Sequence, residues 1–222
     1  QFTDSVPLLT NIAHHIVAMD SYLYLEPQFL LREELREPHN YFAILQAIAQ
    51  GRTRLNEIAQ ATGLGRQPVS RYLAVLQDLQ VIERRVPVTE AQPAKSRKGL
   101  YRLRDPFLRF WFRFVFPQVS LLERGYTAPV LAQIEAELPG FIGPLFEELC
   151  QEWVLEQGST APWGFLPTRV GAWWGQEGEI DIMALGEEGV LFGECKWTTR
   201  PVGTNILDDL KRKAYPRVQE GG

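Results

Sequence analysis

Cysteine and histidine are scarce in this 222-residue chain, which contains two cysteines and three histidines. Cys150 and Cys195 lie in apolar or mixed contexts and have no spacing typical of a disulfide framework or a zinc site. The adjacent His14 and His15 would point apart on a helix, and His39 stands alone. These absences exclude a zinc site and are typical of a protein of the reducing cytoplasm.

The chain has no apolar run long enough to span a membrane, and no basic-then-apolar leader. It contains five lysines, none of which follows a glycine, so the phosphate-binding pattern G-x-x-x-x-G-K-[ST] is absent. We therefore expect a cytoplasmic chain without membrane contacts and without its own phosphate loop. With 45% apolar and 23% charged residues, the composition is that of a globular chain of one large or two modest domains.

Positive charge is concentrated in one segment. Residues 66–104 carry nine Arg or Lys against three acids, a local balance of +6 in a chain of net charge −4. The remaining residues must therefore carry −10. One basic segment in an acidic protein favours a local site for a polyanion.

Three amphipathic stretches fill residues 38–78. The first has apolar residues at helical spacing and ends at Gly51, and the second has Thr53 as its expected N-cap and ends at Gly63. The third has Pro68 in its first turn. Their expected inward faces are Tyr41, Ile44, Leu45, Ile48; Leu55, Ile58, Ala59; and Val69, Tyr72, Leu73, Leu76. Two helices joined by a short Gly-containing turn predict a helix-turn-helix whose third segment is the recognition helix.

The strands "VIERRVPV" and "GLYRLRD" follow, joined by the basic loop "TEAQPAKSRK", which predicts a winged helix. The outward face of the recognition helix is polar and small, with Gln67, Ser70, Arg71 and Ala74. We expect this domain to bind nucleic acid, most simply double-stranded DNA, through Gln67, Ser70, Arg71, Lys95, Arg97 and Lys98. The alternative is a packing module with an ordinary solvated basic face.

The next stretch, "DPFLRFWFRFVFP", starts with Asp105 as a cap and Pro106 at the first helical position. A helix that is apolar nearly all round is buried, so we expect Arg109 and Arg113 to pair with acids or reach solvent rather than to stack on bases. The helical connector beyond it has Gly and Pro breaks, which indicate a boundary near residues 135–140.

The last third predicts a helix, three strands and a second helix. The hairpin "EIDIMALGEEGVLFGECKW" has Asp181 near its start and Glu194 and Lys196 near its end. Two carboxylates at one end of a sheet are hard oxygen ligands for Mg²⁺ or Mn²⁺, and a lysine beside them could stabilise charge on a phosphate. The alternative is a surface ion pair between Glu194 and Lys196 that contributes little.

An acid on one strand, followed by a turn and by an acid-x-lysine sequence on the next strand, resembles the motif of the PD-(D/E)XK nuclease superfamily, whose core has this order of helix, strands and helix. The resemblance implies a restriction-endonuclease-like α/β domain in which Asp181 and Glu194 bind metal and Lys196 assists. It also implies an assisting acid on the first helix, which "GPLFEEL" offers as Glu147, with Glu148 as its neighbour.

A broader resemblance rests on "FLLREELREPHNYFAILQAIAQG", "GLYRLRDPFLRFWFRFVFP", "GAWWGQEGEIDIMAL" and "GECKW". These motifs look like the C-terminal half of archaeal-type ATP-binding proteins of the AAA/STAND kind. The resemblance implies a remnant of an ATPase lid at 1–37, a winged helix at 38–104, a connector at 105–137 and a nuclease-like domain at 138–222. It also implies that ATP binds only an ATPase module absent from this chain, which would be a fragment that lacks the nuclease fold's final strand.

Three interpretations follow: a DNA-binding, metal-dependent nuclease-like region of an ATPase; an inactive nuclease-like scaffold whose winged helix binds; or a pair of domains that contact a partner protein, the ATPase domain or another copy of the chain.

Overall fold

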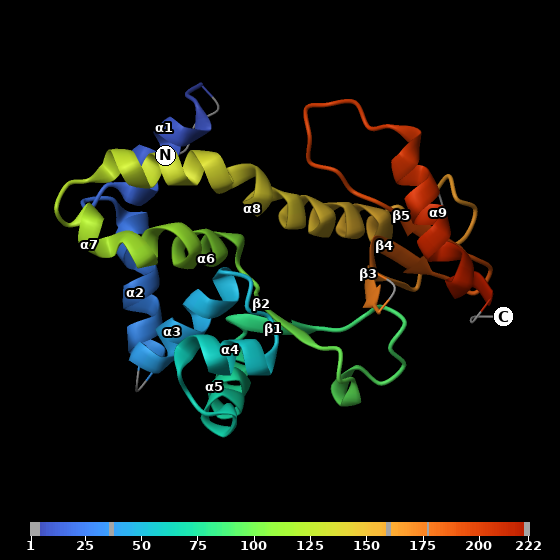
Figure 1. The fold of residues 1–222 in the computed structure, drawn as a ribbon, viewed down its shortest axis with the longest axis horizontal. Helices are drawn as coiled ribbons and strands as arrows, with labels where there is room; N and C mark the ends of the chain where they lie inside the picture. The colour runs from blue at the N-terminus through green and yellow to red at the C-terminus, as the bar shows by residue number, and fades with distance from the viewer. Residues whose placement is uncertain (1–4, 36–37, 159–160, 177, 220–222) are drawn as a thin grey trace. The chain divides into compact units, whose positions relative to one another are not determined.

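The computed structural model describes residues 5–35, 38–158, 161–176 and 178–219 (Figure 1). Residues 1–4 and 36–37 of the expected N-terminal helical segment, and residues 220–222, lie outside this range. By their contacts, residues Gln1–Arg85 and Leu100–Leu138 form one unit, and Val86–Gly99 and Pro139–Gly222 form the other. The finer division into four parts at residues 37, 104 and 137 stays a prediction. Among the described residues, no helix is long and apolar enough to cross a membrane.

The first unit begins with α1 (Leu8–Ile12), which continues as a π-helical turn (Ala13–Val17), and α2 (Tyr22–Glu34). The Ser21 hydroxyl accepts a hydrogen bond from the Tyr24 N–H at 3.3 Å, which satisfies one of the free donors at the start of α2. Helical structure in this segment agrees with the sequence prediction.

A winged helix follows, and it confirms the predicted fold class. It consists of α3 (Pro38–Ala49), α4 (Leu55–Thr62), α5 (Arg66–Asp78) and an antiparallel ribbon of β1 (Ile82–Arg85) and β2 (Leu100–Leu103) (Figure 1). The predicted inward residues Ile44, Leu45, Ile58, Val69, Leu73 and Leu76 are buried. Gly63 ends α4 in the left-handed region at φ 68°, which glycine adopts without steric cost.

The predicted N-cap of α4 was wrong by one residue. Arg54, not Thr53, occupies that position. The Glu57 carboxylate accepts hydrogen bonds from the N–H groups of both Thr53 and Arg54, each at 3.1 Å. This acid at the third helical position thus makes the half of a capping box that satisfies main-chain donors at the start of the helix.

The aromatic stretch is buried, as predicted. It forms α6 (Pro106–Phe110), a π-helical turn (Trp111–Val115), a 3-10 turn (Phe116–Gln118) and α7 (Val119–Leu122). The Asp105 carboxylate caps it by accepting the Leu108 N–H at 2.9 Å. The Arg113 guanidinium pairs with the Glu137 carboxylate at 2.9 Å, and the Arg109 Nε donates to the Leu103 carbonyl at 2.6 Å. Both arginines therefore serve structure, and the base-stacking alternative has no support.

Helix α8 runs unbroken from Thr127 to Glu156, so the expected helix breaks in the connector are wrong. The helix contains both Pro139 and Pro144, each of which removes one main-chain hydrogen bond. Ile134 and Val154, on either side of the prolines, are both buried. Burial of apolar residues at both ends offsets the lost hydrogen bonds.

In the second unit, β3 (Arg169–Gly175), β4 (Gly178–Leu185) and β5 (Val190–Gly193) form an antiparallel sheet in the order β3-β4-β5, followed by α9 (Thr204–Gln219). Ile182 and Ala184 pack with Val154 of α8 on one face of the sheet. Ile180 and Met183 pack on the other face, with Leu210 of α9 against them. The predicted order of helix, three strands and helix is confirmed, and it gives the mixed α+β fold class.

Candidate functional site

A β-bulge lies in β4 at the predicted metal ligand Asp181. Gly171 of β3 pairs with Met183 and Trp173 pairs with Ile180, so Asp181 and Ile182 together face the single residue Ala172. A bulge redirects the side chains on either side of it. This bulge explains why Ile180 and Met183, three residues apart, pack in the same core cluster.

Asp181 is a buried carboxylate that closes the end of β5. Asp181 is only 7% exposed. Its Oδ2 accepts a hydrogen bond from the Cys195 N–H at 2.8 Å. On α8, the Gln151 amide donates to the Asp181 carbonyl at 2.6 Å. Burial raises the pKa of the Asp181 carboxyl and the Glu194 charge raises it further, while the Cys195 N–H opposes the shift. Burial thus contributes more to the raised pKa than repulsion between the two acids.

Glu194 lies directly after β5, which ends at Gly193. The predicted strand, which extended through Lys196 to residue 197, is therefore too long at its end, and neither Glu194 nor Lys196 belongs to β5. Its Oε1 accepts from the Lys196 ammonium at 2.5 Å. Its Oε2 is buried and, among the described residues, has no hydrogen-bond partner. The ammonium of Lys213 on α9 lies 4.0 Å from Oε2, which is too far for a hydrogen bond.

Lys196 is held as a cation. Its hydrogen bond to Glu194 raises the pKa of the ammonium, and the charges of Glu194, Asp181 and Glu147 contribute further. A lysine with a raised pKa stays protonated at neutral pH, so it can stabilise negative charge but cannot act as a base.

Glu147 of α8 is close enough for its charge to act on both Lys196 and Cys195. It does not complete a metal cluster, because no three acid, cysteine or histidine side chains of the described chain are arranged to hold one ion. The described side chains therefore give no support for Glu147 as a third metal ligand.

Sequence reasoning missed Lys213, whose ammonium pairs with Asp209 at 2.9 Å as well as approaching Glu194. The i,i+4 spacing of Asp209 and Lys213 on a helix predicts their ion pair, but no sequence signal connects α9 to Glu194.

The structure also brings together the two cysteines, whose spacing predicts no pairing. The thiol of Cys195 packs against Cys150 in the core on the α8 face of the sheet. Burial raises the pKa of Cys195 to about 12, and a hydrogen bond with the Cys150 thiol adds to the effect. A thiol with so high a pKa is a poor nucleophile, so we assign this pair to packing.

The predicted recognition face of α5 is free to meet a ligand. Gln67, Ser70, Arg71 and Ala74 are exposed, whereas the opposite face is buried. The exposed positions follow the i, i+3, i+4, i+7 spacing of one helix face.

The basic loop of the wing belongs, by its contacts, to the second unit. The Val88 N–H donates to the Ala172 carbonyl at 3.0 Å, and the Val88 side chain packs in the cluster around Trp173. The indole of Trp174 donates to the Lys98 carbonyl at 3.0 Å. The loop therefore covers the open edge of β3, although Lys95, Arg97 and Lys98 remain exposed.

The Lys98 ammonium is 3.0 Å from the Glu90 carboxylate, so part of its charge is already neutralised.

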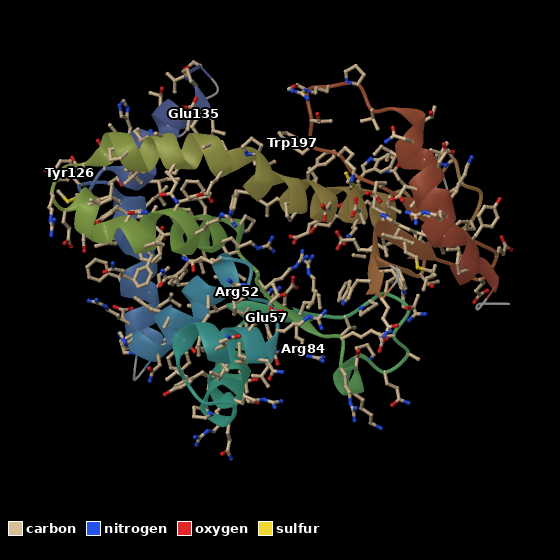
Figure 2. The ribbon with its side chains drawn as sticks, viewed as in Figure 1. Arg52, Glu57, Arg84, Tyr126, Glu135 and Trp197 are labelled. Carbon is tan, nitrogen blue, oxygen red and sulfur yellow. The ribbon has the colours of Figure 1, made fainter. Side chains whose placement is uncertain are left out.

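A cleft of about 570 Å³ opens next to the acidic residues. It is lined by Pro139, Phe146, Lys196, Trp197, Thr198 and Thr199. Figure 2 labels Trp197, which lies in the segment between β5 and α9. Sequence reasoning did not single out Trp197 as a site residue, although it directly follows the Glu-Cys-Lys triplet.

Two known families match parts of the chain. Residues 40–85 match the IclR helix-turn-helix domain. This range covers α3 from residue 40 onward, α4, α5 and β1, so the first unit contains a helix-turn-helix, a type of domain that binds DNA. Residues 111–212 match a family described as archaeal and bacterial proteins of unknown function. That match includes Asp181, Glu194 and Lys196.

One curated relative is a protein of Methanocaldococcus jannaschii that is described as uncharacterized. It is 35% identical over 214 residues, which cover 94% of this chain and 48% of the relative. The chain thus spans about half the length of the curated relative that it matches.

Proposed function

We propose that this chain is a DNA-binding, nuclease-like region in which Asp181 and Glu194 hold Mg²⁺ or Mn²⁺ and Lys196 assists hydrolysis of a phosphodiester. In this proposal the helix-turn-helix recruits double-stranded DNA, and the α/β domain supplies the chemistry.

One observation carries the metal site: the buried Oε2 of Glu194 has no hydrogen-bond partner among the described residues. An unsatisfied buried carboxylate oxygen costs on the order of 1–3 kcal/mol or more. A divalent ion would satisfy this oxygen. It would also relieve the unfavourable burial that raises the pKa of the neighbouring Asp181.

The donor set fits a hard cation. Mg²⁺ retains several waters and is commonly bound through one or two carboxylates together with substrate phosphate oxygens. Two carboxylates are therefore sufficient, and a cluster of three acids is not required. A bound Mg²⁺ or Mn²⁺ would supply a Lewis acid that polarises the phosphate.

The Lys196 ammonium would contribute charge. Because its pKa is raised, it carries a positive charge at neutral pH and can stabilise negative charge that develops on a phosphate oxygen. The nearby Glu147 contributes to holding that charge on Lys196. Lys196→Ala should therefore abolish cleavage while Mn²⁺ binding is retained.

Titration with Mn²⁺, followed by the EPR signal of the free ion, tests the site directly. We expect the wild-type chain to bind Mn²⁺, and Asp181→Asn and Glu194→Gln each to weaken binding at least tenfold. Glu187→Gln is the matched control, because Glu187 is an exposed carboxylate in the turn of the same hairpin.

If the wild-type chain binds no Mn²⁺, or if both site variants bind as the wild type does, the metal proposal fails. The second candidate function is then favoured: an inactive nuclease-like scaffold that binds DNA or a partner protein. The pairing of Glu194 with Lys196 at 2.5 Å supports this candidate, because an ion pair can be purely structural.

For DNA binding we propose that α5 enters the major groove with Gln67, Ser70 and Arg71 toward the bases and phosphates. Their exposure on one helix face supports this role. Lys95, Arg97 and Lys98 of the wing are proposed as further phosphate contacts.

We further propose that the chain works as part of a longer ATP-binding protein of the AAA/STAND kind. The support is the resemblance of its motifs to that family and the length of the curated relative, of which the chain spans 48%. ATP would then be bound by the other part of such a protein, which would also be a partner of this region. We also propose that copies of this chain can assemble into a homo-oligomer.

A further inference from the structure

The cleft beside Lys196 presents an aromatic wall. The rings of Phe146 on α8 and Trp197 after β5 lie with centroids 5.4 Å apart at an interplanar angle of 55°. Trp197 is 51% exposed, although a large aromatic side chain is usually buried. Its ring is therefore available to a planar ligand.

The remaining lining of the cleft is polar. Lys196 lines it, and Thr198 and Thr199 add two hydroxyl groups. The Thr198 hydroxyl already accepts a hydrogen bond from the Arg200 N–H at 3.0 Å, which fixes the backbone after the tryptophan. The exposed side chain of Arg200 follows directly in the sequence. An aromatic face next to positive charge is a combination by which proteins bind single-stranded nucleic acid, and the hydroxyl groups add hydrogen-bonding capacity.

An adjacent cleft provides a contrast. It shares Phe146 but is lined by the acidic residues Glu152 and Glu156 together with Leu149, Cys150 and Trp153. The charged residues that line this second cleft are both acidic, whereas the charged residue that lines the first cleft is Lys196, so the first cleft suits a polyanion better.

We propose that the cleft of Phe146 and Trp197 binds an unpaired nucleobase of a single-stranded segment, with the base stacked on Trp197. The inference rests on the proposed nuclease-like function, because the same strand would present its phosphate to Lys196, which lines the cleft. It names the substrate class: a single strand, or a duplex with an unpaired end, rather than a blunt duplex.

The experiment measures binding of a fluorescein-labelled ten-nucleotide oligo(dT) to the 222-residue chain by fluorescence anisotropy. EDTA is present, so that the result does not depend on a metal. Alanine substitution of a stacking aromatic commonly costs about 5- to 150-fold in affinity, so we expect a loss in this range for Trp197→Ala. Trp197→Phe should retain most of the affinity, whereas Trp197→Leu, which is apolar but not aromatic, should lose it. Trp153→Ala is the matched control, because Trp153 is equally exposed at 53% but lines the acidic cleft.

Wild-type affinity in Trp197→Ala, or full affinity in Trp197→Leu, overturns the proposal. An equal loss in Trp153→Ala also overturns it, because the apolar surface would then act without a defined subsite, as a surface for a protein partner does. The Mn²⁺ titration keeps the two proposals apart. If Trp197→Ala loses oligo(dT) binding but the wild-type chain binds no Mn²⁺, the nuclease proposal alone is removed. If the wild-type chain binds Mn²⁺ but Trp197→Ala binds oligo(dT) as the wild type does, the base subsite alone is removed.

Discussion

The carboxylate of Asp181 on β4 accepts the main-chain N–H of Cys195 at 2.8 Å, at the point where regular pairing between β4 and β5 has ended at Gly193. This hydrogen bond replaces a ladder bond with a side-chain bond. It places the main chain of Glu194 and Lys196 next to a buried acid.

The first prediction concerns stability and pH. The folded-state pKa of Asp181 lies above its ordinary value of 3.8, mainly because of burial. The folded chain therefore binds more protons than the unfolded chain between these two values, and stability falls as pH rises through that window. Asp181→Asn removes this loss and retains an oxygen acceptor for the Cys195 N–H. We expect the variant to be at least as stable as the wild type at pH 7 in urea denaturation.

Asp181→Ala provides the comparison, because alanine removes the acceptor of the partly buried Cys195 N–H. We expect this variant to be less stable than Asp181→Asn by about 1–3 kcal/mol. A lower stability of Asp181→Asn than of the wild type at pH 7, with equal stability below the ordinary pKa, would contradict the argument.

The second prediction concerns the thiol of Cys195. Its pKa of about 12 compares with an ordinary value of 9.0, so the thiolate fraction at pH 7 is lower by about a thousandfold. In a Cys150→Ser variant, which isolates Cys195, iodoacetamide should alkylate the folded chain far more slowly than the urea-unfolded chain. Mass spectrometry measures both rates, and similar rates would show that the thiol is neither buried nor perturbed.

Local signals in the sequence were sufficient for most of the fold. Residues at helical spacing such as Ile44, Ile58 and Leu73 are buried as predicted, because an amphipathic helix has one way to hide its apolar face. The cap at Asp105 and the burial of the aromatic stretch were also readable. The unbroken course of α8 was not, because the proline rule is local while the packing of Ile134 and Val154 is tertiary.

The site was only partly predictable for the same reason. The residue types and the hairpin order indicated Asp181, Glu194 and Lys196 as a group. The bulge at Asp181, the approach of Lys213 and the packing of Cys195 on Cys150 depend on contacts between distant segments. Docking of Val88 on β3 joins residues far apart in the chain, and no local pattern indicates it.

The third prediction concerns this docking of the wing loop. Lys95, Arg97 and Lys98 are exposed sites for trypsin, and the hydrogen bond from Trp174 to the Lys98 carbonyl restrains the main chain there. Trp174→Phe keeps the aromatic ring but removes the donor, so we expect faster tryptic cleavage in the loop. Gel electrophoresis over a time course measures the rate. Trp153→Phe is the control, and equal rates in the wild type and Trp174→Phe would argue that the loop is not held by this bond.

The fourth prediction concerns the recognition helix. Arg71 is exposed on the polar face of α5, where a guanidinium can contact a phosphate or a base edge. Each phosphate contact removed lowers the slope of log affinity against log salt by about one unit. We therefore expect Arg71→Ala to weaken binding to a duplex and to reduce that slope, measured by anisotropy from low to moderate salt. Lys211→Ala removes an exposed cation from α9 and should leave the slope unchanged. If Arg71→Ala and Lys211→Ala give the same slope as the wild type, the helix-turn-helix of this chain is a packing module rather than a DNA-binding one.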